Sequence, residues 1–261
     1  MTLLVGPEDK APLIDHLIEL RNRLMIAIGV VFILFSLLFS LLFFGSYGDI
    51  IFEILMHPLR QVVGPDFRMV YTGLNQAFWT YVKMTAFVSV FIGSPVLLLQ
   101  LWRFVAPGLY QSEKRAVVPF LILAPLLLCL GGAFAYFMVL PIIFQFYLSF
   151  TSPTLEALPS INEYLDLVTD YLFLCGVVFE LPVVLLLLIR AGMTSTAKLV
   201  QVRRYAIVAI FISAAVVAPD PLSQILMAVP LLALYELTIL AGPFMERQRS
   251  QVAEQDEEQE L

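Results

Sequence analysis

The chain has 261 residues, of which 60% are hydrophobic and only 14% are charged. A soluble domain has about 45–50% apolar and about 25% charged residues, so a globule of this size could not hide so much apolar surface from water. The composition therefore excludes a soluble enzyme, a disordered protein and a nucleic-acid-binding protein, and it predicts a polytopic membrane protein.

Three apolar runs in the first half of the chain are long enough to cross a bilayer, whose hydrocarbon core of about 30 Å needs about 20 helical residues. The first covers residues 24–44, and no convincing signal-peptide cleavage site follows it. The second covers about 77–102, with Lys83 near its outer end, where a long side chain can reach the interface. The third covers 116–140 and is predicted to end at Pro141.

Two shorter helices are predicted in the loops between these spans. Residues 50–59 read as a short interfacial helix that ends near His57 and Pro58. Residues 142–150 read as another short helix, placed in the loop after the third span. Both are expected on the outer side of the membrane.

The second half of the chain contains three further spans. The fourth covers 168–189 and is interrupted by Glu180 and Pro182. The last two cover 205–218 and 222–241, and the charge-free core of each has 14 residues. Such cores are about 21 Å long, shorter than the bilayer. Only Pro219, Asp220 and Pro221 separate them, so they are predicted to form a tight hairpin of two short helices.

The distribution of basic residues orients these six spans. Twelve of the fifteen lysines and arginines fall in segments that lie on one side of the membrane. The positive-inside rule assigns that side to the cytoplasm. The prediction is an all-α fold with both termini cytoplasmic: a cytoplasmic segment 1–23, a single six-helix domain 24–244, and a tail 245–261. The tail is acidic and buries no apolar surface, so it is predicted to be disordered.

No catalytic or metal-binding pattern is found in the sequence. The two histidines, His16 and His57, are expected on opposite sides of the membrane and cannot share a metal. Cys129 and Cys175 lie within apolar runs and are interpreted as small buried hydrophobic residues. No metalloprotease, serine hydrolase or nucleotide-binding motif appears. The sequence therefore predicts a protein that is not an enzyme and has no metal and no cofactor.

A few carboxylates remain as candidate functional groups. Glu19 shares a helical face with His16 and Arg23, so it either forms an i,i+4 ion pair with Arg23 or faces a cationic ligand from the cytoplasm. Glu113 follows Ser112, a plausible N-cap, and either complements the helix dipole or faces a ligand on that same side. Spacing alone favours the structural role for both.

Glu180 lies near the middle of the fourth span, where an ionised group costs about 2.5–3.5 kcal/mol on insertion scales. Such a residue is expected to face protein or water and to be functional. Asp220 can cap the last helix, with Pro221 at its first position, and Gln224 is a polar residue one turn further on. Local chemistry alone explains Asp220.

Taken together, these residues resemble the TatC family, the core membrane subunit of the twin-arginine protein translocase. The resemblance runs from about residue 13 to residue 244. The matching segments are HLIELRNRL at 16–24, SPV at 94–96, QLWRFVAPGLY at 100–110, EKR at 113–115, FAYF at 134–137, LP at 140–141, FELP at 179–182, APD at 218–220, SQ at 223–224 and AVP at 228–230. Each segment is weakly specific, but the ordered set with six spans is highly specific.

The resemblance implies a receptor that binds paired arginines of signal peptides and supports transport of folded proteins, driven by the proton-motive force. It implies a cupped, glove-like fold in the cytoplasmic membrane of a prokaryote. The implied partners are single-span TatA/TatB-type subunits, signal peptides, membrane lipid and further receptor copies.

The resemblance also assigns roles to individual residues. Glu19 and Glu113 match the two carboxylates that bind the twin arginines. Arg21, Phe104 and Pro107 match other positions near that site. Glu180 matches a carboxylate of the concave membrane face that is associated with partner subunits. The outer positions that match the family, the last hairpin being implicated in partner contact, are Asp220, Gln224 and Pro58.

Two alternative functions remain open at this point. A secondary transporter would use Glu180 as a proton or cation site, although the sequence has no internal repeat of the kind many transporters show. A purely structural membrane scaffold would need neither Glu19 nor Glu113.

Overall fold

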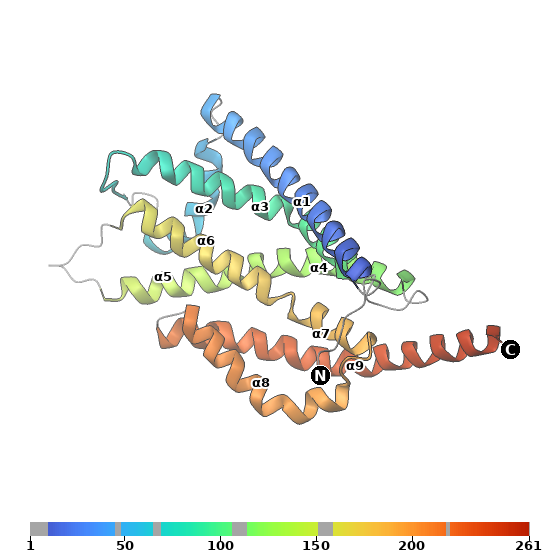
Figure 1. The fold of residues 1–261 in the computed structure, drawn as a ribbon. Helices are drawn as coiled ribbons and strands as arrows, with labels where there is room; N and C mark the ends of the chain where they lie inside the picture. The colour runs from blue at the N-terminus through green and yellow to red at the C-terminus, as the bar shows by residue number, and fades with distance from the viewer. Residues whose placement is uncertain are drawn as a thin grey trace, which may run out of the picture.

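The computed structural model describes residues 10–44, 48–64, 69–105, 114–150, 159–217 and 220–260. Those residues form a helical protein (Figure 1). The elements are α1 (Lys10–Phe44), α2 (Gly48–Val63), α3 (Gln76–Val105), α4 (Lys114–Phe134), the π-helix η3 (Ala135–Val139), α5 (Leu140–Leu148), α6 (Ile161–Val178), α7 (Leu181–Arg190), α8 (Thr196–Val217) and α9 (Pro221–Glu260).

Five helical stretches among the described residues are long and apolar enough to cross a membrane. They are Ile18–Leu42, Gln76–Leu101, Ile122–Leu148, Ile161–Arg190 and Pro221–Arg247. A sixth crossing, α8, is more polar, because Lys198, Arg203 and Arg204 lie in its first half. Its apolar part, residues 205–217, is about 20 Å long. The short apolar core that the sequence predicts for the hairpin is therefore found in α8. The helices α8 and α9 themselves are longer than the predicted spans.

The third crossing does not end at Pro141, and in this the prediction is wrong. The helix continues through α4, η3 and α5 to Leu148, so no separate helix begins at residue 142. Proline lacks an N–H and its ring presses on the preceding turn. The π-helix widens that turn, and the Leu140 N–H donates to the carbonyl of Ala135, five residues earlier. The wider turn lets the helix pass a proline that the sequence marks as its end.

The fourth crossing begins earlier than predicted, at Ile161, and it is broken where the sequence expects a break. Helix α6 ends at Val178, residues Phe179 and Glu180 form a turn, and α7 begins at Leu181 with Pro182 in its first turn. A proline is well tolerated there because the first N–H groups of a helix have no helical acceptor.

The helices pack mainly as neighbouring pairs: α1 on α3, α4 on α6, and both α7 and α8 on α9. In Figure 1 the α1–α3 pair and the α8–α9 pair lie on opposite sides of the central helices. The α4–α6 contact is close, since a Cβ atom on Gly131 would lie 2.4 Å from the carbonyl oxygen of Cys175. Glycine allows the two backbones to approach this closely. The main core cluster draws buried residues from several helices, and α6 contributes the most of them.

Helix α9 continues to Glu260 through the segment that the sequence predicts to be a disordered tail. Good helix formers, chiefly Glu, Gln and Arg, fill this segment, and no proline follows Pro243. Near the start of the segment, a Glu246 carboxylate oxygen accepts a hydrogen bond from the backbone N–H of Thr196 at 2.7 Å. This contact caps α8 from a neighbouring helix. The structure describes residues 245–260 as helix where the sequence predicts a disordered tail.

The ends of the helices that carry basic residues gather at one side of the molecule. The start of α1, the ends of α3 and α7, and the starts of α4 and α8 all lie toward the right of Figure 1. Lys83, by contrast, lies near the opposite end of α3, where its ammonium contacts Asp166 of α6 at 2.8 Å. The fold thus has one strongly basic end, and this end contains Glu19.

Candidate functional site

Glu19 lies in the first half of α1, before the apolar part of that helix. It forms the i,i+4 ion pair with Arg23 that its spacing allows. Its Oε1 accepts hydrogen bonds from Nε of Arg23 at 2.9 Å and from Nη2 of the same guanidinium. The side chain of Glu19 is 35% exposed and that of Arg23 is 24% exposed. The carboxylate is therefore half-buried, reachable from solvent and already bound to a guanidinium.

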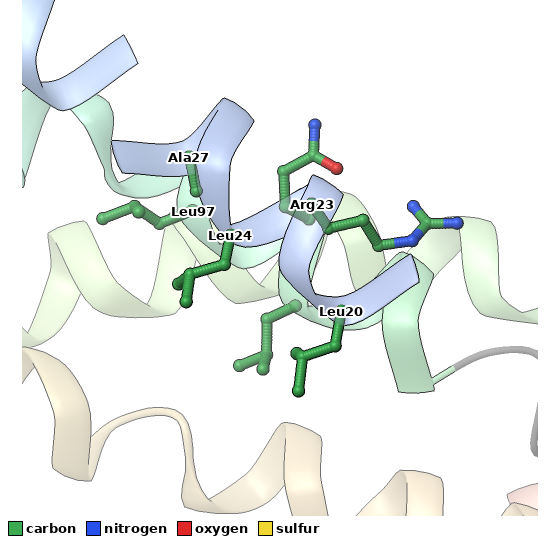
Figure 2. A pocket seen from close by; sticks show the side chains of 7 residues that line it. Leu20, Arg23, Leu24, Ala27 and Leu97 are labelled. Carbon is green, nitrogen blue, oxygen red and sulfur yellow. The ribbon is translucent and has the colours of Figure 1, made fainter. Parts of the chain in front are cut away.

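An apolar groove adjoins this ion pair, between α1 and α3. Its volume is about 220 Å³, and Arg23 forms part of its wall together with Leu20, Leu24, Ala27, Leu97, Gln100 and Leu101. Figure 2 shows the leucines of α1 directed into the groove while the Arg23 guanidinium extends away from them. Leu24 and Leu101 expose 54% and 52% of their surface, so the groove is open. A charged acceptor and an apolar surface thus lie side by side.

The other residues assigned to this end of the molecule lie apart from the ion pair or outside the description. The Arg21 guanidinium donates to the Asn22 side chain at 3.2 Å from Nη2 and at 3.4 Å from Nε, and it is exposed. Phe104 is part of α3, but its side chain is not among those described. Pro107 and Glu113 lie outside the described residues, between the end of α3 and the start of α4.

Glu180 is buried in the turn between α6 and α7, with 8% of its surface exposed. Neither of its carboxylate oxygens has a hydrogen-bond partner among the described residues. Both backbone groups of Glu180 are hydrogen-bonded. Its N–H donates to the Val177 carbonyl at 3.1 Å, and its carbonyl accepts from the Val184 N–H at 3.1 Å. Because a buried carboxylate without partners is costly, Glu180 is a second candidate site, distinct from Glu19.

The α8–α9 hairpin is organised by Asp220. One carboxylate oxygen accepts from the Ser223 N–H at 2.8 Å, which is the N-cap bond that the sequence suggests for α9. The other accepts from the Tyr147 hydroxyl at 2.9 Å and so links the hairpin to α5. Gln224 donates to the Phe211 carbonyl of α8 at 3.1 Å and ties the two helices together. Asp220 and Gln224 therefore lie together, and both have structural roles.

Pro58 lies inside α2 instead of at its end, and the helix continues to Val63, beyond its predicted end. Its side chain is fully buried, and α2 packs against α5 through the buried side chains of Leu55, Met56 and Leu59. Sequence reasoning identified Pro58 only through the family resemblance. It missed the groove entirely, because leucines in a membrane span give no signal of their own.

Comparisons with known proteins agree on one family. The sequence model of the family described as "Sec-independent protein translocase protein (TatC)" matches residues 15–230. A TatC protein of Magnetococcus marinus is 47% identical over 253 residues, covering 97% of this chain and 91% of the relative. The TatC protein of Escherichia coli K12 is 36% identical over 238 residues, covering 91% and 90%.

A solved structure gives the same answer for the fold. The crystal structure described as the twin-arginine translocase receptor TatC in DDM superimposes with a TM-score of 0.75 at 38% identity. The superposition covers 87% of this chain and 99% of the crystallised chain. A second crystal structure with the same receptor name gives a TM-score of 0.74. The fold of this chain as a whole is therefore that of the crystallised TatC receptors.

Proposed function

The chain belongs to the TatC family of Sec-independent protein translocase proteins, and from this membership we propose that it is the signal-peptide receptor of a twin-arginine translocase. In this proposal the carboxylate of Glu19 binds one arginine of the signal peptide and that of Glu113 binds the other. The observation that carries the proposal is the Glu19 carboxylate, which already accepts two hydrogen bonds from the guanidinium of Arg23, a residue that also lines an open apolar groove.

The chemistry of a guanidinium explains why such a site would require arginine. A guanidinium is planar and donates two parallel hydrogen bonds to a carboxylate, a geometry that the point charge of lysine cannot copy. Charge-assisted hydrogen bonds contribute about 1.5–3 kcal/mol each when they are partly desolvated. Two arginines held by two carboxylates would therefore distinguish a paired-arginine signal from an ordinary basic segment.

The groove beside Glu19 suits the next part of a signal peptide. Signal peptides carry an apolar stretch after their basic end. The leucines that line the groove would receive apolar side chains from that stretch, once the arginines fix the direction of the peptide. Burial of apolar area contributes about 25 cal/mol per Å². The proposed site therefore combines an electrostatic anchor with a hydrophobic surface.

We further propose that both termini face the cytoplasm of a prokaryote and that the protein spans its cytoplasmic membrane six times. The basic helix ends gather at one end of the fold, as the positive-inside rule requires of the cytoplasmic side.

Partner subunits of the single-span TatA and TatB type would contact Glu180 and the outer hairpin of Asp220 and Gln224. A partner helix with a polar side chain would satisfy the two carboxylate oxygens of Glu180.

The test is site-specific crosslinking of a twin-arginine signal peptide to the protein in membranes. Glu19→Gln and Glu113→Gln should each weaken crosslinking, and a Lys-Lys peptide should bind worse than an Arg-Arg peptide. Glu163→Gln is the matched control, since Glu163 is an exposed carboxylate at the opposite end of the molecule. Unchanged crosslinking in both variants and with the Lys-Lys peptide would favour a structural scaffold over the receptor. Solute flux in vesicles without partner subunits would instead favour a transporter that uses Glu180.

A further inference from the structure

We propose that Arg23 is an internal competitor for the Glu19 carboxylate, so that a signal peptide binds by exchanging its own arginine for Arg23. This inference rests on the proposed function and specifies how the receptor site is regulated. It starts from the contact between Arg23 and Glu19, in which Nε and Nη2 of one guanidinium both donate to Oε1 of Glu19. That contact has the chemistry expected between Glu19 and an incoming arginine.

The geometry allows the exchange without rearrangement of the fold. Both residues lie on α1, one helical turn apart, so the helix holds the competitor at the site permanently. Arg23 contributes its stem to the wall of the groove, while its guanidinium extends away from the leucines (Figure 2). Rotation about the side-chain bonds can release the guanidinium to water while the stem and the groove stay in place.

Arg21, the other basic residue with a described side chain at this end of α1, does not offer the same contact. The Arg21 guanidinium donates to Asn22 and is turned away from Glu19 in its hydrogen bonding. The Glu19–Arg23 pair is also only half-buried, at 35% and 24% exposure, so water can replace either partner. A deeply buried pair would hold its partners too tightly to exchange, whereas this pair is weak enough to open.

The competitor lowers the apparent affinity of the receptor for every cationic ligand by the same factor. A ligand that binds only the open form has its dissociation constant divided by the fraction of receptor that is open. For a pair of this exposure the factor is about two- to fivefold. Arginine still binds better than lysine, and the ratio between them stays the same. The effect is a uniform penalty, since every peptide must displace the internal pair when it binds.

A positioning role for Arg23 makes the opposite prediction. If Arg23 served to orient the Glu19 carboxylate for the peptide, its removal would weaken binding. If Arg23 instead repelled the peptide as a general positive charge, its removal would strengthen binding whether or not Glu19 could pair with it. The sign of the effect, and its dependence on Glu19, therefore separate the three roles.

The experiment measures peptide binding to the full chain in lipid nanodiscs by fluorescence anisotropy, with a labelled Arg-Arg signal peptide and its Lys-Lys version. Arg23→Gln should tighten binding of both peptides by the same factor, about two- to fivefold. Arg23→Lys keeps the charge but loses the two-bond contact, so it should give a smaller gain. In a Glu19→Gln background, Arg23→Gln should give no gain, as expected for two groups that act through each other.

Each other result overturns the exchange. Weaker or unchanged binding in Arg23→Gln excludes competition, and a gain that persists in the Glu19→Gln background shows a general charge effect. Either outcome leaves the proposed receptor function standing, provided that Glu19→Gln itself weakens binding. If wild-type binding is indifferent to Glu19→Gln, the proposed binding site fails and the exchange fails with it. A monodisperse elution profile for each variant in detergent shows that the comparison is made between folded proteins.

Discussion

The hydroxyl of Tyr136 donates a hydrogen bond at 2.5 Å to the backbone carbonyl of Ile54. Ile54 lies four residues before Pro58, and its carbonyl is the one that Pro58, having no N–H, leaves without a helical donor. Tyr136 belongs to the π-helix η3, which precedes Pro141. The π-helix therefore positions the side chain that supplies the hydrogen bond missing from α2 at Pro58. Two prolines far apart in the sequence are thus connected through one tyrosine.

Tyr136→Phe is expected to destabilise the protein by about 0.5–1.5 kcal/mol, because it removes the hydrogen bond to the Ile54 carbonyl. The ring itself should stay in place, since phenylalanine keeps the stacking on His57, whose ring centroid lies 6.3 Å away. Thermal unfolding in detergent measures the loss. In a Pro58→Ala background the helix supplies its own donor, so the same substitution should cost less. Equal losses in the two backgrounds would show that Tyr136 does not compensate for Pro58.

Gly131→Ala is expected to separate α4 from α6 and to lower the thermal stability strongly. The added Cβ would lie 2.4 Å from the Cys175 carbonyl oxygen and 2.9 Å from Cα of Gly176, and neither is part of a flexible side chain. Forced separation of packed helices costs about 1–3 kcal/mol. Gly29→Ala on α1 is the matched control, because nothing lies within 4 Å of its added Cβ. Comparable melting temperatures for both variants would contradict the close contact.

The Asp220 carboxyl should make the stability of the α8–α9 hairpin depend on pH. Burial alone would raise its pKa, but hydrogen bonds from Ser223 and Tyr147 dominate and hold the pKa below the ordinary value of 3.8. A group whose pKa is lowered by folding stabilises the protein above its unfolded pKa, and this stabilisation is lost as the pH falls through the folded pKa. The wild-type protein should therefore lose this contribution below about pH 4.

Substitutions at Asp220 separate the charge from the cap. Asp220→Asn keeps an oxygen that can cap α9, so at pH 7 it should be milder than Asp220→Ala, for which a loss of about 0.5–2 kcal/mol is typical. It should also remove the contribution of this carboxyl to acid destabilisation. Melting temperatures in detergent between pH 3 and pH 7 test both statements. A wild-type protein and an Asp220→Asn variant with identical pH profiles would show that the carboxyl does not contribute.

Much of the fold follows from local chemistry and was predictable from the sequence. Pro182 predicts the break in the fourth crossing, and Pro219 with Pro221 predicts the tight hairpin. The capping bond of Asp220 was predictable, because its donor, the N–H of Ser223, lies only three residues further along the chain. The spacing of Glu19 and Arg23 likewise offered the ion pair as one of two readings. In each case the information lies within one or two turns of the chain.

What could not be predicted depends on contacts between distant segments. The sequence places a helix end at Pro141, because nothing nearby reveals that a π-helix will widen the turn before it. Tyr136 looks like one aromatic among many until α2 packs against it. The groove exists only because α1 and α3 lie side by side, and its leucines are indistinguishable in sequence from lipid-facing ones. The helical extension of α9 was not predicted for a different reason, because repulsion between its acidic residues argues against a helix while their helix propensity favours one.

The modest hydropathy of α8 has a consequence for how the chain is made. Arg203 and Arg204 lie in its first half, and a helix with such residues partitions poorly into lipid when it emerges alone. Its partner α9 supplies Glu236, which pairs with Arg203, and Gln224, which binds the Phe211 carbonyl. These contacts become available only after α9 has been synthesised. The two helices should therefore enter the bilayer as one unit, so insertion of the last quarter of the protein waits for synthesis of its C-terminal helix.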